Sequence, residues 1–164
     1  AVVPVFVFDQ ALLHHPETGS ARVAFMLDCL RSLDQDLRDR GGRLILRLGD
    51  PIEVLPNLIR ETDSEGIYAY VDYERIYGRV RDARLNQALQ DQNLRIRWFE
   101  PTAGTSELMP YSEYRKVWYK EMSAEMLPAP SKISVPDEIK SEPLPSLIAL
   151  GLLPDQKPNP PAGT

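Results

Sequence analysis

"VVPVFVFD" (residues 2–9) is a nearly continuous apolar run that ends in an acid. Such a run is typical of a strand buried on both faces of a parallel sheet, because no side chain along it needs to face water. Three later stretches have a strand-like composition, namely "RLILRLGD" (43–50), "IYAYVDY" (67–73) and "LRIRWFE" (94–100). The last alternates apolar and polar residues, which indicates an edge or half-exposed strand.

Between these strands, helices are predicted over 20–40, where Gly41-Gly42 stops the first, over 51–65, with Gly66 after the end of the second, and over 77–93. In the third helix the apolar spacing is expected to turn three side chains inward, those of Val80, Leu85 and Leu89. Strands that alternate with helices in this way predict an α/β fold with a doubly wound, Rossmann-like parallel sheet.

Composition excludes several classes of protein. The net charge of −5 and the isoelectric point near 5.1 argue against binding of nucleic acid by this chain alone, because phosphate binding needs a basic face. A single cysteine, Cys29, excludes an internal disulfide framework and a cysteine-based zinc site. No apolar run is long enough for a membrane span, and the opening residues lack the basic region of a signal peptide. We therefore expect a cytoplasmic protein that does not contact a membrane.

Two domain segments are expected. Nine of the fifteen prolines lie after residue 127, so 128–164 is predicted to be an extended connector that follows an α/β domain at 1–127. Before the connector, aromatic residues recur at helical spacing, which favours packing on a sheet or a neighbouring domain over base stacking; they are Tyr111, Tyr114, Trp118 and Tyr119.

Candidate ligand residues follow the strands, because open α/β sheets bind ligands beyond the carboxyl ends of their strands. Phe8 and Asp9 follow the first strand, and Asp9 either binds a ligand or caps a loop. Asp72 and Glu74 follow the third strand and face the same way if extended geometry continues; the alternative is a solvated loop. The stretch 49–51 (Gly-Asp-Pro) is typical of a tight turn and a helix cap.

Three arginines open the third helix, where the helix dipole disfavours positive charge, so they are expected to pair with nearby acids; they are Arg79, Arg81 and Arg84. The chain contains neither a GxGxxG nor a P-loop spacing, and no arrangement of a catalytic triad is visible. The residues alone therefore indicate a ligand-binding edge without a catalytic centre.

Several co-linear segments closely resemble the N-terminal α/β domain of the DNA photolyase/cryptochrome family. They are "VPVFVFD", "IYAYVDYE…YGRVRD", "MPYSEYRKVWYKEM" and "LIALGL…PNPPAGT". The resemblance implies a five-stranded sheet whose first strand and helix are absent from this chain. It also implies a C-terminal helical domain, likewise absent, that holds FAD and contacts damaged DNA. This chain alone is then expected to be inactive in repair.

The resemblance further implies an antenna chromophore in this domain. The family's deazaflavin-type positions match Phe8, Asp9, Arg22, Asp72 and Glu74. The pattern favours deazaflavin over folate, because a folate-type site has Asn-Glu where residues 77–78 are Tyr-Gly. Residues 75–76 (Arg-Ile) replace the family's usual proline and lengthen the rim of the cleft by one residue, and an empty cleft is the alternative.

Three functions follow as hypotheses. The first is the antenna domain of a photolyase that repairs UV-damaged DNA with blue light. The second is the same domain of a cryptochrome photoreceptor, which signals without repair. The third is a freestanding nucleotide-binding module, which would need a phosphate-binding glycine loop that the sequence lacks.

Overall fold

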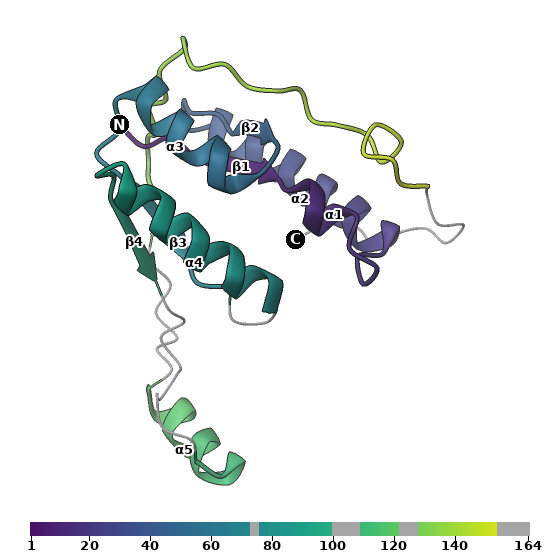
Figure 1. The fold of residues 1–164 in the computed structure, drawn as a ribbon, viewed down its shortest axis with the longest axis vertical. Helices are drawn as coiled ribbons and strands as arrows, with labels where there is room; N and C mark the ends of the chain where they lie inside the picture. Colours follow the sequence, from purple (N-terminus) through teal and green to yellow (C-terminus); the bar gives the residue numbers. More distant parts are fainter. Residues whose placement is uncertain (73–75, 100–108, 122–127, 154–164) are drawn as a thin grey trace. The chain divides into compact units, whose positions relative to one another are not determined.

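Strands and helices alternate along the chain in the computed structural model, which describes residues 1–72, 76–99, 109–121 and 128–153. The elements are β1 (Val5–Phe8), α1 (Gln10–Leu13), α2 (Ser20–Arg38), β2 (Ile45–Leu48), α3 (Pro51–Thr62), β3 (Ile67–Tyr70), α4 (Ile76–Asp91), β4 (Ile96–Phe99) and α5 (Tyr111–Glu121) (Figure 1). All described strand pairs are parallel, so the predicted Rossmann-like α/β class is confirmed.

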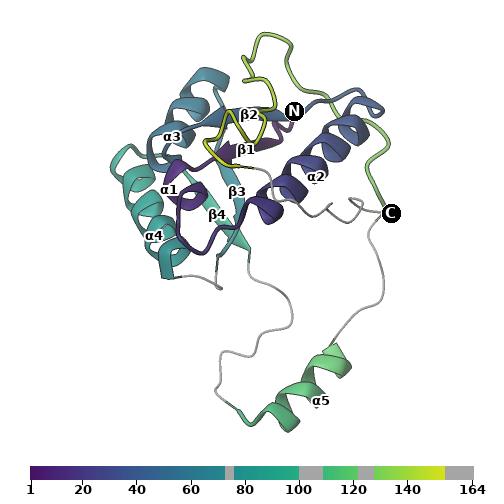
Figure 2. The same ribbon diagram turned by 90° about the vertical axis from the view of Figure 1, so that its right-hand side faces the viewer.

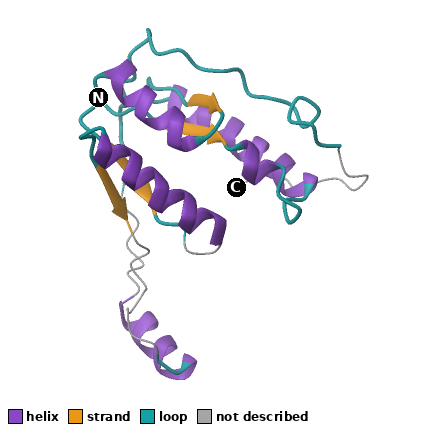
Figure 3. Ribbon diagram, viewed as in Figure 1, coloured by secondary structure: helices purple, strands orange, loops and turns teal. Residues whose placement is uncertain are grey.

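The chain forms two compact units. Unit 1 comprises Ala1–Asp63 together with Pro130–Thr164, and unit 2 comprises Ser64–Ala129. Each unit contains one two-stranded parallel sheet, drawn as a pair of orange arrows in Figure 3. In unit 1, β1 pairs with β2; in unit 2, β3 pairs with β4.

The sheet of unit 1 is covered on both faces. Phe8 and Leu46 pack in one apolar cluster with Leu27 and Leu30 of α2. Ile45, which is fully buried and faces the other way, packs with Leu58 of α3. Helices on opposite faces of the β1–β2 pair are visible in Figure 2 and give this unit the doubly wound arrangement that the strand composition predicted.

The proline-rich segment 130–153, which we call the strap, packs on unit 1 and covers the free edge of β2. The amide of Leu46 donates to Ser141 Oγ at 2.9 Å, and its carbonyl accepts from the amide of Glu142 at 3.0 Å. Arg43 donates through Nη2 to the carbonyl of Ile139 at 2.6 Å. The strap has no strand of its own among the described residues, yet it satisfies backbone groups that an edge strand would otherwise leave open.

Strap side chains also complete the core of unit 1. Val135 and Ile139 are buried in the cluster beneath α3, and Leu150 is buried in the cluster beneath α2. The described part of the proline-rich segment is a structural component of unit 1, and its role as an interdomain connector stays a prediction. The predicted domain boundary at residue 127 stays a prediction.

Unit 2 is covered on one face of its sheet. Leu85 and Leu89 of α4 are 3% and 0% exposed, and the sheet residues Ile67 and Ile96 are half-buried. The alternating burial of β4 confirms the predicted half-exposed strand. Val80, expected to face inward, is 44% exposed; that expectation was wrong, because Asp82 occupies the inward position instead.

Most elements are shorter than the sequence predicted, and two of the differences lie after strands that carry candidate residues. The loop expected after β1 begins with the short helix α1, which Asp9 caps. The third strand, expected to reach residue 73, ends at Tyr70, and residue 73 lies outside the described residues.

Candidate functional site

The carboxyl end of β1 carries the first two candidate residues. The Phe8 ring is 1% exposed and meets Phe6 edge-on at 5.0 Å between centroids, so only its backbone is available at the surface. Asp9 is 6% exposed, and its Oδ1 accepts hydrogen bonds from the amides of Ala11 at 3.0 Å and Leu12 at 3.3 Å. Asp9 is therefore the N-cap of α1, the simpler of its two predicted roles.

An aspartate also caps a helix at the carboxyl end of β2. Asp50 Oδ1 accepts from the amide of Ile52 at 2.9 Å and caps α3, with Pro51 in the first turn. Gly49 has a φ of 138°, a conformation that favours glycine, and its amide donates to the Phe8 carbonyl at 3.1 Å. The expected turn-and-cap role of 49–51 is confirmed, and the two strand ends are tied together by this hydrogen bond.

Arg22 is the exposed cation next to these strand ends. It lies in the first turn of α2, and the following residue, Val23, is buried with Phe8 and Leu13 in one cluster. The Arg22 side chain makes no hydrogen bond or ion pair with another described residue. A positive charge in the first turn opposes the helix dipole, so helix stability does not explain an arginine here. Arg22 is available for an anionic or polar ligand.

Asp72 follows β3 and packs against the start of α4. A Cβ at Gly78 would lie 2.0 Å from Asp72 Oδ2, so glycine leaves the space that this carboxylate needs. The amide of Asp72 donates to Asp82 Oδ2 at 3.0 Å. Arg81 lies between the two acids, with Nη2 at 2.8 Å from Asp82 Oδ1 and 3.7 Å from Asp72 Oδ2. The expected ion pairing is confirmed for Arg81.

This cluster of Asp72, Gly78, Arg81 and Asp82 joins the end of β3 to α4. Asp82 is 8% exposed, and a buried carboxylate needs such partners because desolvation would otherwise disfavour its charge. Sequence reasoning missed Asp82, although a signal was present: it lies three and seven residues before Leu85 and Leu89, on the same helical stripe. An acid in an apolar stripe indicates a buried polar partner.

The predicted antenna residues have different outcomes. Phe8, Asp9 and the first turn of α2 with Arg22 share unit 1, whereas Asp72 belongs to unit 2. Glu74 and Arg75 lie outside the described residues. The expectation that the five side chains form one chromophore site therefore stays a prediction.

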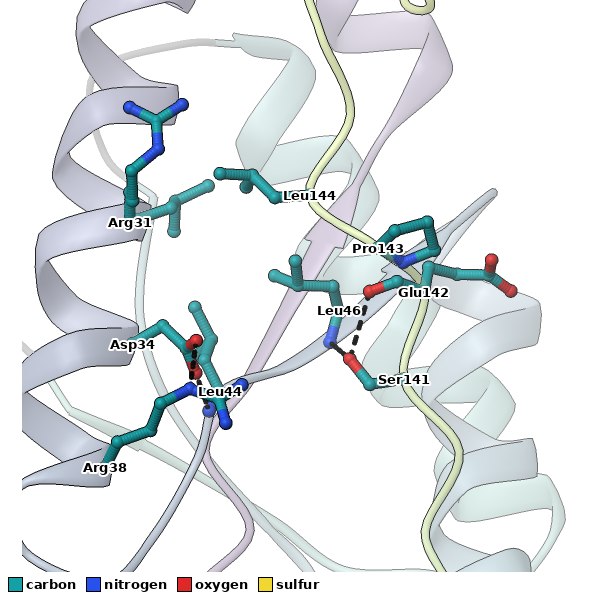
Figure 4. Close-up of a pocket in the computed structure, with 10 residues that line it drawn as sticks. Arg31, Asp34, Arg38, Leu44, Leu46, Ser141, Glu142, Pro143 and Leu144 are labelled. Carbon is teal, nitrogen blue, oxygen red and sulfur yellow. Dashed lines mark hydrogen bonds and ion pairs between the residues drawn. The ribbon is translucent and has the colours of Figure 1, made fainter.

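A hollow of about 420 Å³ lies in unit 1 between α2, β2 and the strap (Figure 4). Leu44, Leu46 and Leu144 form part of its wall. Two of its polar side chains pair with each other, since Asp34 accepts from Arg38 Nε at 2.7 Å and also from the amide of Leu44 at 2.8 Å. The hollow is thus the seam between α2 and the strap.

Metal and membrane sites are not found in the part of the chain that the structure describes. Within the described ranges, no group of three or more histidines, cysteines or acids is placed to hold a metal ion. None of the described helices has the length and apolarity needed to cross a bilayer.

Comparison with known proteins decides the family. The sequence profile of the family described as DNA photolyase matches residues 1–131, from before β1 to the start of the strap. The chain belongs to the DNA photolyase family. The family resemblance expected from the co-linear segments is confirmed.

Photolyases and a cryptochrome are among the relatives. The deoxyribodipyrimidine photo-lyase of Streptomyces griseus is 31% identical over 156 residues, which cover 88% of this chain and 34% of that protein. The cryptochrome DASH of Natronomonas pharaonis is 29% identical over 167 residues, covering 92% of this chain and 35% of that protein.

A solved structure gives the same match in three dimensions. The crystal structure of a bacterial class III photolyase from Agrobacterium tumefaciens superposes with a TM-score of 0.71 at 27% identity, covering 94% of this chain and 33% of that one. The chain thus spans about a third of the length of each of these three photolyase-family proteins.

Proposed function

We propose that this chain is the antenna-binding α/β domain of a DNA photolyase, a protein that repairs UV-damaged DNA with blue light. The observation that carries the proposal is Arg22, an exposed cation in the first turn of α2, the helix that follows the carboxyl end of β1, in a chain whose first 131 residues match the photolyase family. Ligands of open α/β sheets bind at this end of the strands.

The residues of unit 1 fit a polar aromatic chromophore. Apolar walls supply most of the affinity in such sites, and a few polar groups set the orientation. Arg22 offers a charge-assisted donor, while the buried cluster of Phe8, Leu13 and Val23 fixes the first turn of α2 against β1. An antenna transfers excitation energy and needs a fixed ring rather than acid–base groups, which agrees with the absence of a catalytic triad from the sequence.

Chromophore binding tests this role. The purified chain is titrated separately with a deazaflavin, a reduced folate, FMN and FAD, and binding is followed by absorbance and chromophore fluorescence. We expect the deazaflavin to bind most tightly. Arg22→Ala should weaken its binding about tenfold, the order of one charge-assisted hydrogen bond. Arg31→Ala, which removes another exposed arginine of α2, should leave binding unchanged.

Failure of all four chromophores to bind would contradict the antenna role and favour an empty cleft. Equal losses in the two arginine variants would mean that charge on α2, rather than Arg22, attracts the ligand.

A cryptochrome photoreceptor is the second candidate, because the Natronomonas pharaonis relative is a cryptochrome DASH. The resemblance implies that FAD and contact with damaged DNA belong to a helical domain outside this chain, so the two candidates separate only in the complete protein. Repair of UV-damaged DNA under blue light supports the photolyase; bound FAD with a light response but no repair supports the cryptochrome.

A further inference from the structure

Helix α4 carries apolar residues on the side that faces away from its sheet. Ile76 is 82% exposed, Val80 is 44% exposed, and Ala83 is exposed as well. These three residues are spaced by four and three, so they lie along one side of the helix. We call them the outer stripe. Together with Arg79 they line a shallow hollow of about 290 Å³.

The outer stripe lies opposite the buried side of α4. The buried residues of the helix are Gly78, Asp82, Leu85 and Leu89. Because an α-helix has 3.6 residues per turn, this set and the outer stripe point in opposite directions. A surface helix usually has its apolar residues on the one side that packs on the core. Adjoining apolar side chains on its exposed side therefore indicate an interaction surface.

Two arginines border the outer stripe. Arg79 and Arg84 are exposed and lie on either side of it by helical spacing. Neither makes a hydrogen bond or ion pair with another described residue, whereas Arg81 pairs with Asp82. Arg79 lies in the first turn of α4, where a cation opposes the helix dipole, so helix stability does not explain it. Both arginines are available for acids of a partner.

An amphipathic helix with acidic flanks fits this surface. Apolar residues at intervals of three and four on a partner helix pack on a stripe of the same spacing, and acids beside them would meet Arg79 and Arg84. A second copy of the chain is disfavoured, because a symmetric contact through the stripe would bring the arginines of the two copies together. Single-stranded nucleic acid is disfavoured because the stripe contains no aromatic residue on which a base could stack.

We propose that the outer stripe of α4 docks an acidic amphipathic helix of a partner protein. Ile76 and Val80 are buried in this contact, and Arg79 and Arg84 pair with carboxylates of the partner. Apolar burial supplies most of the affinity, while the ion pairs select an acidic helix over a basic one. The inference does not depend on the antenna role, because it uses neither Arg22 nor the strand ends of unit 1.

Binding of synthetic peptides tests the docking. The purified chain is titrated into a labelled peptide of about 20 residues, long enough to form a helix, with leucines at intervals of three and four and glutamates beside them. A second peptide has lysines in place of the glutamates, and fluorescence anisotropy follows both. We expect the acidic peptide to bind about tenfold more tightly than the lysine peptide. Its binding should weaken as salt is added.

Substitution of the apolar residues locates the contact. Ile76→Gln/Val80→Gln should weaken binding of the acidic peptide about tenfold or more, because apolar burial is lost. Glutamine is a good helix former, so α4 should be retained. Ile148→Gln/Leu153→Gln is the matched control, since it removes two similarly exposed apolar side chains near the end of the described strap segment. It should leave binding unchanged.

Substitution of the arginines tests the charge. Arg79→Gln/Arg84→Gln should weaken binding of the acidic peptide roughly fivefold and remove most of its salt dependence. Lys116→Gln/Lys120→Gln removes the same charge from exposed side chains of α5 and should change the affinity less than about twofold. Hydrogen exchange of the α4 amides, unchanged in every variant, shows that unit 2 remains folded.

Several results would overturn the proposal. They include no binding of the acidic peptide, equal binding of both peptides, and equal losses in the arginine and lysine variants, which would mean that net charge attracts the peptide. Self-association that Ile76→Gln/Val80→Gln abolishes would overturn it in favour of a second copy. Loss of peptide binding in a longer chain that includes the helical domain would overturn it in favour of a contact within the protein.

Discussion

The two units differ in how completely their sheets are covered by other elements. In unit 1 the β1–β2 sheet has α2 on one face, α3 on the other and the strap along the edge of β2. In unit 2 the β3–β4 sheet has α4 on one face, while Tyr68 and Tyr70 of the other face remain 73% exposed. Within the described residues each sheet has two strands, so the difference between the units lies in what covers the sheets.

The difference in coverage goes with a difference in what holds each unit together. Unit 1 buries most of the large apolar core residues, and its candidate polar residue Asp9 serves as a cap. Unit 2 holds its strand end to α4 through the buried Asp82 and presents aromatic rings outward. A two-stranded sheet becomes stable only when it packs against further elements. We therefore expect substitutions in unit 1 to act through the core and substitutions in unit 2 through its polar cluster.

The largest effect is expected from Phe8→Ala. The ring is almost fully buried beneath α2, so its removal should cost unit 1 about 3–5 kcal/mol of unfolding free energy. Exchange of α2 amides measures the loss. Phe99→Ala in unit 2, at a ring that is 37% exposed, should cost much less. Similar losses of unfolding free energy in the two variants would contradict the inference that the unit 1 sheet is buried on both faces and the unit 2 sheet on one.

A smaller loss, about 2–3 kcal/mol, is expected for Asp82→Ala in unit 2. The variant leaves the amide of Asp72 without its acceptor and removes the close partner of Arg81. Denaturation followed by Trp98 fluorescence reports on this unit. Asp91→Ala, at the exposed end of the same helix, should stay within about 0.5 kcal/mol. If both variants unfold alike, the buried cluster is not what holds β3 to α4.

Loss of one strap contact should have a local effect. Ser141→Ala removes the acceptor of the Leu46 amide and should cost about 1 kcal/mol. Exchange at Leu46 should accelerate while α2 stays protected. Ser146→Ala, which removes a hydroxyl that accepts from Ala149 within the strap, serves as control and should leave the Leu46 amide unchanged. Unfolding of the whole of unit 1 by Ser141→Ala would contradict a local effect and would show that this hydrogen bond, more than the buried strap side chains, holds the strap on β2.

The smallest effect is expected from Arg31→Ala. Its ion pair with Asp28 is short, at 2.6 Å, but both side chains are largely exposed. Water and salt screen such pairs, so the cost should be below about 0.5 kcal/mol by thermal unfolding. A larger loss would mean that the wall of the hollow under the strap contributes to the closure of unit 1.

Much of the fold could be predicted from the sequence because its apolar runs are distinctive. The runs around Val5–Phe8 and Ile45–Leu48 are buried or half-buried except at Leu48, and a short continuous apolar run is typical of a strand in a parallel sheet. The cap role of Asp50 followed from its place before Pro51. These features depend on residues that are close together in the sequence, so a short stretch of sequence is enough to predict them.

The rest depends on contacts between distant residues. The ligand role of Asp72 stays a prediction, and the sequence did not show that its carboxylate lies against Gly78 and near Arg81, contacts that form only when α4 folds back on β3. Prolines in the strap predicted an extended segment but not its place along β2. Val80 was misassigned because a buried acid, Asp82, took the inward position in an otherwise apolar stripe.

The discontinuity of unit 1 has a consequence for synthesis on the ribosome. Its first 63 residues emerge early, but Val135, Ile139 and Leu150, which complete its two clusters, are made only after the whole of unit 2. At a translation rate of about 5–20 residues per second, the edge of β2 stays uncovered for several seconds before the strap is synthesised. During that interval the nascent chain presents an unpaired strand to its neighbours, so a pause in translation between residues 64 and 130 should favour aggregation or chaperone binding.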